Sequence, residues 1–194
     1  KKDVLIISPY FVPGDRGVAM MRSLVRRGVR IRILTNSLAT TDAAIVHIGY
    51  SHYRVPLLKM GVDLRELRPK IGAARPRFHP FGHSSASLHA KAVVIDDRTV
   101  FIGSLNMDAR SAHTNTELGL VFESARIAAQ VTALFDDISR YGSYQLKLIG
   151  HTDKLEWIGR GPGAERVWYH DPDTTFMQRF GLMLLTPFAP EQLL

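Results

Sequence analysis

The sequence predicts an α/β fold in which a mixed β-sheet carries helices on both of its faces. Strand-like runs alternate with helical patterns over the first third of the chain. Three further strand-like runs then follow one another between residues 88 and 122, with one amphipathic helical pattern after them. Alternating elements favour parallel pairing and consecutive strands favour antiparallel pairing, so the two together indicate a mixed sheet covered by helices.

The first third of the chain alternates strands with helices. Apolar or alternating runs predict strands at 3–8, 29–35 and 62–67. Helical spacing predicts a helix at 16–28, which Gly28 should end. A second helix is expected at 40–61, where Thr and Asp should cap the start and Pro56 should kink or split it.

The rest of the chain begins with a long loop and ends on an apolar segment. Residues 69–87 have no period and are rich in Pro, Gly and Ser, which is typical of a functional loop. Strands are then expected at 88–95, 98–103 and 116–122, followed by a helix at 125–142. The pattern weakens after residue 143. We therefore expect a half-domain of residues 1–142 and a C-terminal extension of residues 143–194.

Length, charge and composition restrict the class of protein. A chain of 194 residues with 45% hydrophobic content can build one substantial core. The net charge of +7 suits a partner that carries phosphates, either a nucleic acid or an anionic membrane. The absence of cysteine excludes disulfides and thiolate metal sites. Because the chain lacks an initiator methionine and a signal-like region, we expect a piece of a longer protein.

His89 and Lys91 stand two positions apart in the apolar stretch LHAKAVVI. Residues i and i+2 of a strand lie on one face, so both side chains are expected on the same side of the sheet. A lysine in such a strand is costly to bury unless a negative group meets it. The pair therefore predicts a site for an anion.

The residues that follow complete a spaced pattern. Asp96 is the seventh residue after His89, and Gly103, Ser104 and Asn106 end the next predicted strand. The spacing His-x-Lys-x4-Asp, then x6-Gly-Ser-x-Asn, resembles the HKD motif of the phospholipase D superfamily. The stretches ISPYFVP, TNSLATTDAAIVHIGY, MDARSAHTNTELGLVFES and PEQLL resemble the C-terminal half of bacterial cardiolipin synthases, of the shorter type without transmembrane segments.

These residue types suit phosphodiester chemistry. A neutral imidazole can attack phosphorus, whose negative charge repels anionic nucleophiles, and an imidazolium can protonate the departing alkoxide. Lys91 would neutralise the phosphoryl oxygens, and Ser104 and Asn106 would donate hydrogen bonds to them. Such a site needs no metal and no cofactor, and the resemblance implies the same.

The roles of two acids, Asp96 and Glu117, are predicted from strand parity and from the resemblance. Asp96 is an odd number of positions from His89, at the end of the predicted strand, so we expect a structural role at the turn. The imidazole still needs a carboxylate to hold its other nitrogen. Glu117 is the candidate, because the superfamily places its orienting acid at about this distance, and Asn115 should support it.

The resemblance implies that this chain is half of an active site. Two histidines are needed, one to attack and one to donate the proton, and the chain holds one motif. We expect little activity from the chain alone, and a partner that is either an N-terminal half with a second HKD motif or a second copy. First halves usually supply the nucleophile, so His89 is expected to act as general acid and then base.

Three functions stay open at this point: a phosphatidyltransferase that makes cardiolipin, a phosphodiesterase (a phospholipase or nuclease), and a non-catalytic half. The intact motif disfavours the third. Residues 174–194 are too short and broken to span a bilayer but apolar enough to lie in its interface, unless they pack on the sheet or the partner. This favours phospholipid substrates at the cytoplasmic side of a bacterial inner membrane, and no nucleic acid partner.

The remaining polar residues are assigned to structure or to the surface. His47, Tyr50 and His52 in the second helix are expected to be packing or surface groups. The loop histidines 79, 83 and 113 match no trusted metal-ligand spacing. The arginines at 22, 26, 27, 30 and 32 are expected to form a solvated face with a weak preference for anions.

Overall fold

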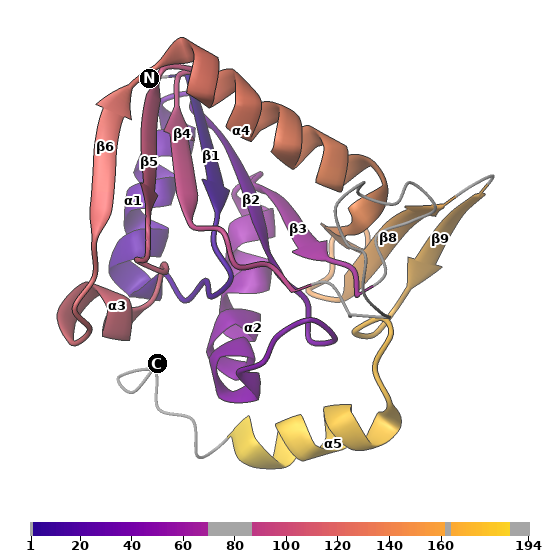
Figure 1. The fold of residues 1–194 in the computed structure, drawn as a ribbon. Coiled ribbons are helices and arrows are strands. Elements are labelled where there is room, and N and C mark those ends of the chain that lie inside the picture. The colour runs from indigo at the N-terminus through magenta and orange to yellow at the C-terminus, as the bar shows by residue number, and fades with distance from the viewer. Residues whose placement is uncertain (1, 70–86, 162–163, 187–194) are drawn as a thin grey trace, which may run out of the picture.

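The computed structural model describes residues 2–69, 87–161 and 164–186, and these residues form one nine-stranded mixed sheet (Figure 1). The strand order is β6-β5-β4-β1-β2-β3-β7-β8-β9. The strands are β1 (Asp3–Ile7), β2 (Arg30–Asn36), β3 (Asp63–Leu67), β4 (Ala92–Ile95), β5 (Thr99–Gly103), β6 (Gly119–Glu123), β7 (Ser143–Leu148), β8 (Leu155–Gly161) and β9 (Ala164–Trp168). β1, β2 and β3 pair in parallel, and the other neighbours pair antiparallel.

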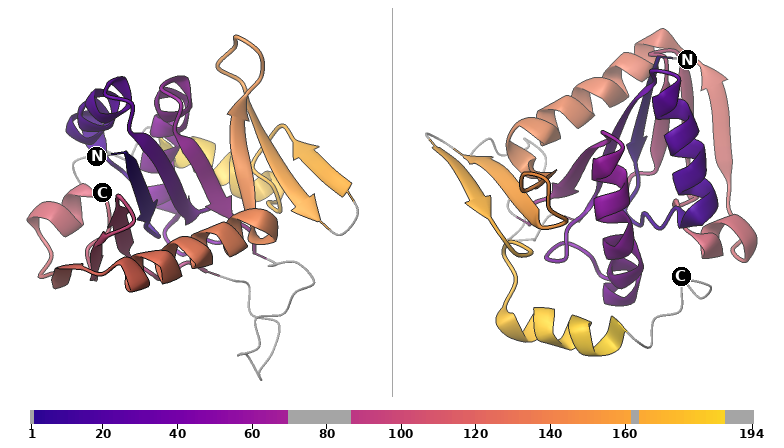
Figure 2. Two further views of the ribbon diagram at one scale, coloured as in Figure 1. Left: turned by 90° about the horizontal axis from the view of Figure 1, so that it is seen from above. Right: turned by 180° about the vertical axis from the view of Figure 1, so that it is seen from behind.

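Helices cover both faces of the sheet, which confirms the predicted fold class. α1 (Gly14–Arg26) and α2 (Ala44–Lys59) lie on one face, and α4 (Ala125–Asp137) crosses the other (Figure 2). The short helix α3 (Ala109–His113) follows β5, and the π-helical turn η1 (Ile138–Gly142) continues α4. α5 (Phe176–Leu185) runs beside α2 at the edge of the molecule.

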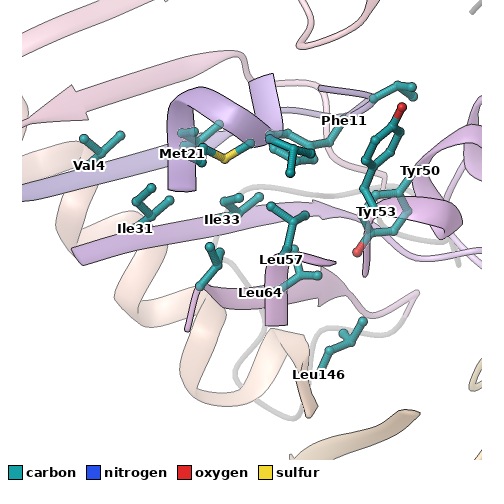
Figure 3. Packing of buried hydrophobic residues seen from close by; sticks show 14 of the residues in the cluster. Val4, Phe11, Met21, Ile31, Ile33, Tyr50, Tyr53, Leu57, Leu64 and Leu146 are labelled. Carbon is teal, nitrogen blue, oxygen red and sulfur yellow. The ribbon is translucent and has the colours of Figure 1, made fainter. Parts of the chain in front are cut away.

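The two faces of the sheet belong to two hydrophobic clusters. In the larger one, side chains such as Ile31, Ile33 and Leu64 meet Met21 from α1 and Leu57 from α2 (Figure 3). Alternate residues of the same strands, among them Leu5, Leu34 and Val94, pack with Phe135 of α4 in the smaller cluster. The central strands are buried on both faces, which is why β1 reads as a continuous apolar run.

The predicted strands at 88–95 and 116–122 are shorter than expected. β4 begins at Ala92 because its partner β1 ends at Ile7, two residues before Pro9. The preceding Leu88 is instead held at the end of β2, where its backbone N–H donates to Asn36 Oδ1 at 2.9 Å. His89 and Lys91 therefore precede the strand rather than belong to it.

Three strands lie where the sequence pattern weakens. β7, β8 and β9 extend the sheet antiparallel beyond β3. Only a few of their side chains are buried, chiefly Tyr144, Leu146 and Trp157, and β9 is almost entirely exposed. Strands that bury so few positions lack the regular alternation by which a strand is predicted.

The helices differ from their predicted form in their ends. α1 ends as predicted, with Gly28 in the left-handed region at φ 79°. α2 begins at Ala44 without a side-chain cap, so the predicted Thr and Asp caps are wrong, and it continues through Pro56. Most of the predicted loop 69–87 lies outside the described residues, as do residues 187–194 of the tail.

Arg32 does not belong to a solvated face, so that expectation is wrong for it. Its side chain is buried, and Nη2 lies 2.8 Å from Oδ2 of Asp3 on the neighbouring strand β1. Arg30 pairs with the same carboxylate. Because Arg30 and Arg32 are two positions apart in β2, they share one face, and that face carries an acid in β1. The α1 arginines 22, 26 and 27 are exposed as expected.

Candidate active site

Two loops that follow central strands are joined beside the motif. The segment after β1 and the segment after β5 meet where Val12 N–H donates to the Met107 carbonyl at 2.6 Å. Met107 N–H in turn donates to the Tyr10 carbonyl and to Ser8 Oγ. The backbone on either side of Asn106 is therefore fixed against the backbone around Tyr10.

These loops and the chain before β4 enclose a pocket of about 400 Å³. His89, Lys91, Gly103, Ser104 and Asn106 all line it, so the structure brings five of the seven predicted site residues together. The other lining residues are Pro9, Tyr10, Asp42, Ser87 and Leu88. His89 is exposed, and Oδ1 of Asn106 is buried without a hydrogen-bond partner among the described residues.

Lys91 is tied to the backbone of the same segment. Its Nζ donates to the His89 carbonyl at 3.1 Å, and its own carbonyl accepts a bond from Gly103 N–H at 3.2 Å. An ammonium group has three donors, so two remain for an anion in the pocket. This arrangement places a half-buried positive charge beside the imidazole.

Ser104 connects the pocket to Glu117. Its hydroxyl donates to a Glu117 carboxylate oxygen and accepts from Leu118 N–H at 3.0 Å. Asn115 Nδ2 donates to the other carboxylate oxygen at 3.3 Å. The bond from Ser104 lowers the pKa of Glu117, and Asn115 and the Lys91 charge act in the same direction. In the described part of the chain the carboxylate is held by Ser104 and Asn115, with no bond to the His89 ring.

Gly103 allows β5 and β6 to approach closely at the pocket. It pairs with Gly119, and the Phe101 ring lies over both residues. A Cβ at Gly103 would lie 2.5 Å from the Leu118 carbonyl oxygen, and a Cβ at Gly119 would lie 2.2 Å from Phe101 Cε2. The two glycines thus hold the hairpin that carries Ser104 and Glu117.

Asp96 lies away from the pocket. It follows the far end of β4, in the left-handed region at φ 53°. Its Oδ1 accepts bonds from the backbone N–H groups of Lys2 and Asp3 at 2.5 and 3.0 Å. Through these bonds the Asp96 carboxylate connects the turn after β4 to the start of β1. The structural role of Asp96 stays a prediction.

The sequence patterns gave no site role to Tyr10 and predicted Asp42 only as a helix cap. Tyr10 OH donates to Asp42 Oδ1 at 2.6 Å, and both line the pocket. Burial raises the pKa of Tyr10 to about 12, with the hydrogen bond and charge of Asp42 acting in the same direction. Tyr10 follows the predicted strand 3–8, and Asp42 lies near the start of the predicted helix 40–61. These positions at element ends were the only indication of a site role. Nothing in their spacing connects them.

His47 and Tyr50 belong to a buried polar cluster rather than to the pocket. Arg54 is at its centre and donates to Glu66, Asp171 and His47 Nε2. Tyr50 OH also donates to Glu66. The cluster joins α2 and β3 to the segment that leads into α5, so these residues have packing roles, as expected.

The mixed sheet with helices on both faces, and the pocket that gathers His89, Lys91 and Asn106, are those of a phospholipase D-like domain. The family described as cardiolipin synthase, PLD-like domain, matches residues 1–139. Cardiolipin synthase C of Escherichia coli K12 is 42% identical over 191 residues, or 97% of this chain and 40% of that protein. Cardiolipin synthase A of Pseudomonas fluorescens SBW25 is 31% identical over 80% of this chain and 29% of that protein. This chain belongs to the cardiolipin synthase family of phospholipase D-like domains.

Solved structures share the fold at low identity. Nuc from Salmonella typhimurium, a phospholipase D family member, has a TM-score of 0.55 and 19% identity, covering 76% of this chain and 84% of that one. The phosphatidylserine synthase of Haemophilus influenzae has a TM-score of 0.56 and 18% identity, covering 97% of this chain and 39% of that one. This chain therefore spans less than half the length of the curated relatives and of the synthase.

Proposed function

We propose that this chain is the C-terminal half of a two-motif phosphatidyltransferase that makes cardiolipin from glycerophospholipids. The observation that carries the proposal is the single pocket in which His89, Lys91, Ser104 and Asn106 converge in a cardiolipin synthase-family domain. The pocket offers an imidazole for proton transfer, an ammonium for phosphoryl charge, and the Asn106 amide, whose Oδ1 has no hydrogen-bond partner among the described residues and whose Nδ2 is a donor. No metal and no cofactor is required for this chemistry.

The reaction proceeds in two displacements. The nucleophilic histidine of the partner's HKD motif attacks phosphorus, and His89 protonates the oxygen of the departing alcohol as its bond to phosphorus breaks. The phosphatidyl group is then carried as a phosphohistidine. In the second displacement His89 takes the proton of the incoming lipid alcohol, whose oxygen forms the new phosphoester bond while the phosphorus–nitrogen bond breaks. Lys91 balances the phosphoryl charge in both steps. Glu117 holds the Ser104 hydroxyl, and in this proposal it orients His89 only once the imidazole turns toward it, since the two side chains are not bonded among the described residues.

A second half or a second copy would supply the missing histidine. The edge strand β6 supports such a partner, since Leu120 and Val121 in the strand and Leu118 just before it are largely exposed. An apolar edge strand left in water invites pairing with another chain. In the proposal, this surface packs against the partner in the complete enzyme, and the chain alone turns over substrate poorly.

The membrane supplies the substrate in this proposal. No helix in the described part of the chain is long and apolar enough to cross a bilayer. α5 exposes Phe176, Met177, Met183, Leu184 and Leu185 to water. An amphipathic helix of this kind suits the interface of a membrane. We propose peripheral binding at the cytoplasmic side of a bacterial inner membrane.

The test is product formation by the complete two-motif protein on vesicles that contain phosphatidylglycerol. A tetra-acyl diphosphatidylglycerol product is expected, and His89→Gln should abolish it without lowering the melting temperature, since His89 is exposed. Lys91→Ala should slow the chemical step by about 100- to 1,000-fold, the typical loss of an oxyanion donor. Cleavage of single-stranded DNA with no action on vesicles would replace this proposal by the nuclease alternative.

A further inference from the structure

Asp42 brings a carboxylate into a pocket whose other charged groups suit an anion. It is exposed and lines the same pocket as Lys91 and His89. The three residues come from different segments, Asp42 from the residues before α2 and the other two from those before β4. Asp42 and Lys91 form no ion pair among the described residues. The pocket therefore keeps separate positive and negative regions.

The carboxylate is held by Tyr10 but retains capacity to bind. Tyr10 OH donates to Oδ1 at 2.6 Å, and a carboxylate has two oxygens with about four acceptor positions. A hydroxyl or ammonium group in the pocket could donate to the positions that remain. An ionised phosphate could not, because it offers only acceptors and would be repelled by the like charge.

The position of this pair is preorganised. The Tyr10 carbonyl accepts from Ser8 Oγ at 2.6 Å and from Met107 N–H at 3.2 Å, next to Asn106. Tyr10 therefore moves with the loop that carries the phosphate-binding residues. A group anchored in this way selects among ligands without an ordering cost on binding.

We propose that Asp42, positioned by Tyr10, binds the alcohol portion of the phosphodiester. The site would take the head-group alcohol that leaves and, after it, the alcohol that accepts the phosphatidyl group. It favours neutral or cationic alcohols that offer a hydroxyl or ammonium donor and disfavours those that carry a further phosphate. The separated charges also orient the diester, with phosphoryl oxygens toward Lys91 and the alcohol toward Asp42. This inference rests on the proposed function and deepens it.

The experiment compares head groups in the complete enzyme. Vesicles contain phosphatidylglycerol and phosphatidylglycerol phosphate in equal amounts, and release of each head-group alcohol is measured. A second set contains phosphatidylethanolamine and phosphatidylglycerol phosphate in equal amounts, with phosphatidylglycerol added as the acceptor alcohol. The wild type should prefer the unphosphorylated donor in both sets. Asp42→Ala should reduce that preference by about tenfold or more, the usual effect of a hydrogen bond to a charged group.

Two further variants separate charge from hydrogen bonding. Asp42→Asn keeps an acceptor but removes the charge, so it should still use phosphatidylglycerol while accepting the phosphorylated donor. Tyr10→Phe keeps the carboxylate, so the preference should weaken but keep its direction. Asp153→Asn, an exposed acid paired with Lys59, is the control and should leave the ratio unchanged.

Three results would be decisive. An unchanged ratio in Asp42→Ala and Asp42→Asn overturns the inference while leaving the proposed function intact. A lower melting temperature with an unchanged ratio also overturns it, because it assigns Asp42 a structural role only. A wild-type enzyme that releases no alcohol from any phospholipid refutes the proposed function, and this inference with it.

Discussion

At the scale of single residues, the glycine pair beneath Phe101 decides how closely β5 and β6 approach. Gly103 and Gly119 are cross-strand partners, yet their surroundings differ in kind. A Cβ at Gly103 would lie closest to backbone, with the Leu118 oxygen at 2.5 Å and the Gly119 Cα at 2.8 Å, and would also lie 2.9 Å from Phe101 Cζ. At Gly119 the three nearest atoms all belong to the Phe101 side chain.

This difference predicts which substitution can be rescued. Gly103→Ala and Gly119→Ala should each destabilise the protein by about 1–3 kcal/mol through overpacking. Adding Phe101→Leu should recover most of the loss for Gly119→Ala, because the obstructing ring is gone, and little of it for Gly103→Ala. Urea denaturation of the single and double variants measures both effects. Gly161→Ala is the control, since among the described residues its Cβ would meet nothing closer than 3.8 Å.

Equal rescue of both glycine variants would contradict the argument. It would mean that the Phe101 ring, rather than the backbone of Leu118 and Gly119, limits the approach of the strands at Gly103. Loss of stability without rescue at either position would show that a Cβ on β6 disturbs the hairpin in another way.

At the scale of elements, α2 carries the polar cluster that joins the sheet to the segment before α5. Glu66 is fully buried and accepts bonds from Tyr50, Arg54 and Trp157. Burial of Asp171 opposes its ionisation, but the Arg54 guanidinium and the His47 bond hold the pKa of that carboxyl well below its usual range. The cluster therefore favours an ionised Asp171 and a neutral His47.

His47 makes this cluster sensitive to acid. Burial lowers the pKa of its imidazole below the ordinary value of 6.5, and the nearby Arg54 charge acts in the same direction. Below about pH 6.5 the unfolded chain binds more protons at this residue than the folded chain does. The contribution of neutral His47 to the free energy of unfolding is complete above about pH 6.5. It is lost as the pH falls toward the pKa of His47 in the folded protein.

The melting temperature should therefore fall between pH 7.5 and pH 5. His47→Gln should flatten this decline, since the amide can accept the Arg54 bond without titrating. His151→Gln, at an exposed position in the turn after β7, should leave the decline unchanged. If His47→Gln and the wild type lost stability in parallel over this range, the titration of His47 would not be its cause. Protonation of Asp171 would reduce stability only at lower pH, because its pKa lies well below the usual range.

At the scale of the whole molecule, α5 lies at the edge where the active-site loops lie. β1 runs from the N-terminus toward that edge, and α5 crosses it next to α2 in both Figure 1 and the right view of Figure 2. A capping box of Thr175 and Gln178 begins the helix, and none of its residues is buried. A membrane bound by the exposed side chains of α5 would thus lie close to the pocket.

Polar substitutions on α5 test this arrangement. The double variant Phe176→Glu and Met183→Glu should fold normally, because the two residues are 69% and 62% exposed. Its sedimentation with phosphatidylglycerol vesicles should fall several-fold, since interfacial binding scales with buried apolar area. Leu134→Glu on α4 removes a comparable exposed apolar side chain on the other face of the sheet and should leave sedimentation unchanged. Equal loss in both variants would show that net charge, rather than α5, governs binding.

The fold class and half of the candidate site could be predicted from local patterns. A continuous apolar run predicted β1, and alternating runs predicted β2 and β3. The spacing from His89 to Asn106 predicted the pocket-lining residues of two neighbouring segments. Such patterns involve residues close together in the chain, because a single strand or turn determines which residue types fit at neighbouring positions. The same holds for Gly28, whose conformation ends α1.

What only the tertiary structure decided involves residues far apart in the chain. The Tyr10–Asp42 bond joins positions 32 residues apart, and the Arg54–Asp171 bond joins positions 117 apart. The first residue of β4 is set by the end of its partner β1 and by the bond from Leu88 to Asn36. The positions of β7 to β9 are set by their pairing with β3 and with one another rather than by their own hydrophobic pattern. Hydrophobic periodicity reports only which face of one element is buried, so it cannot show which polar groups of different elements meet.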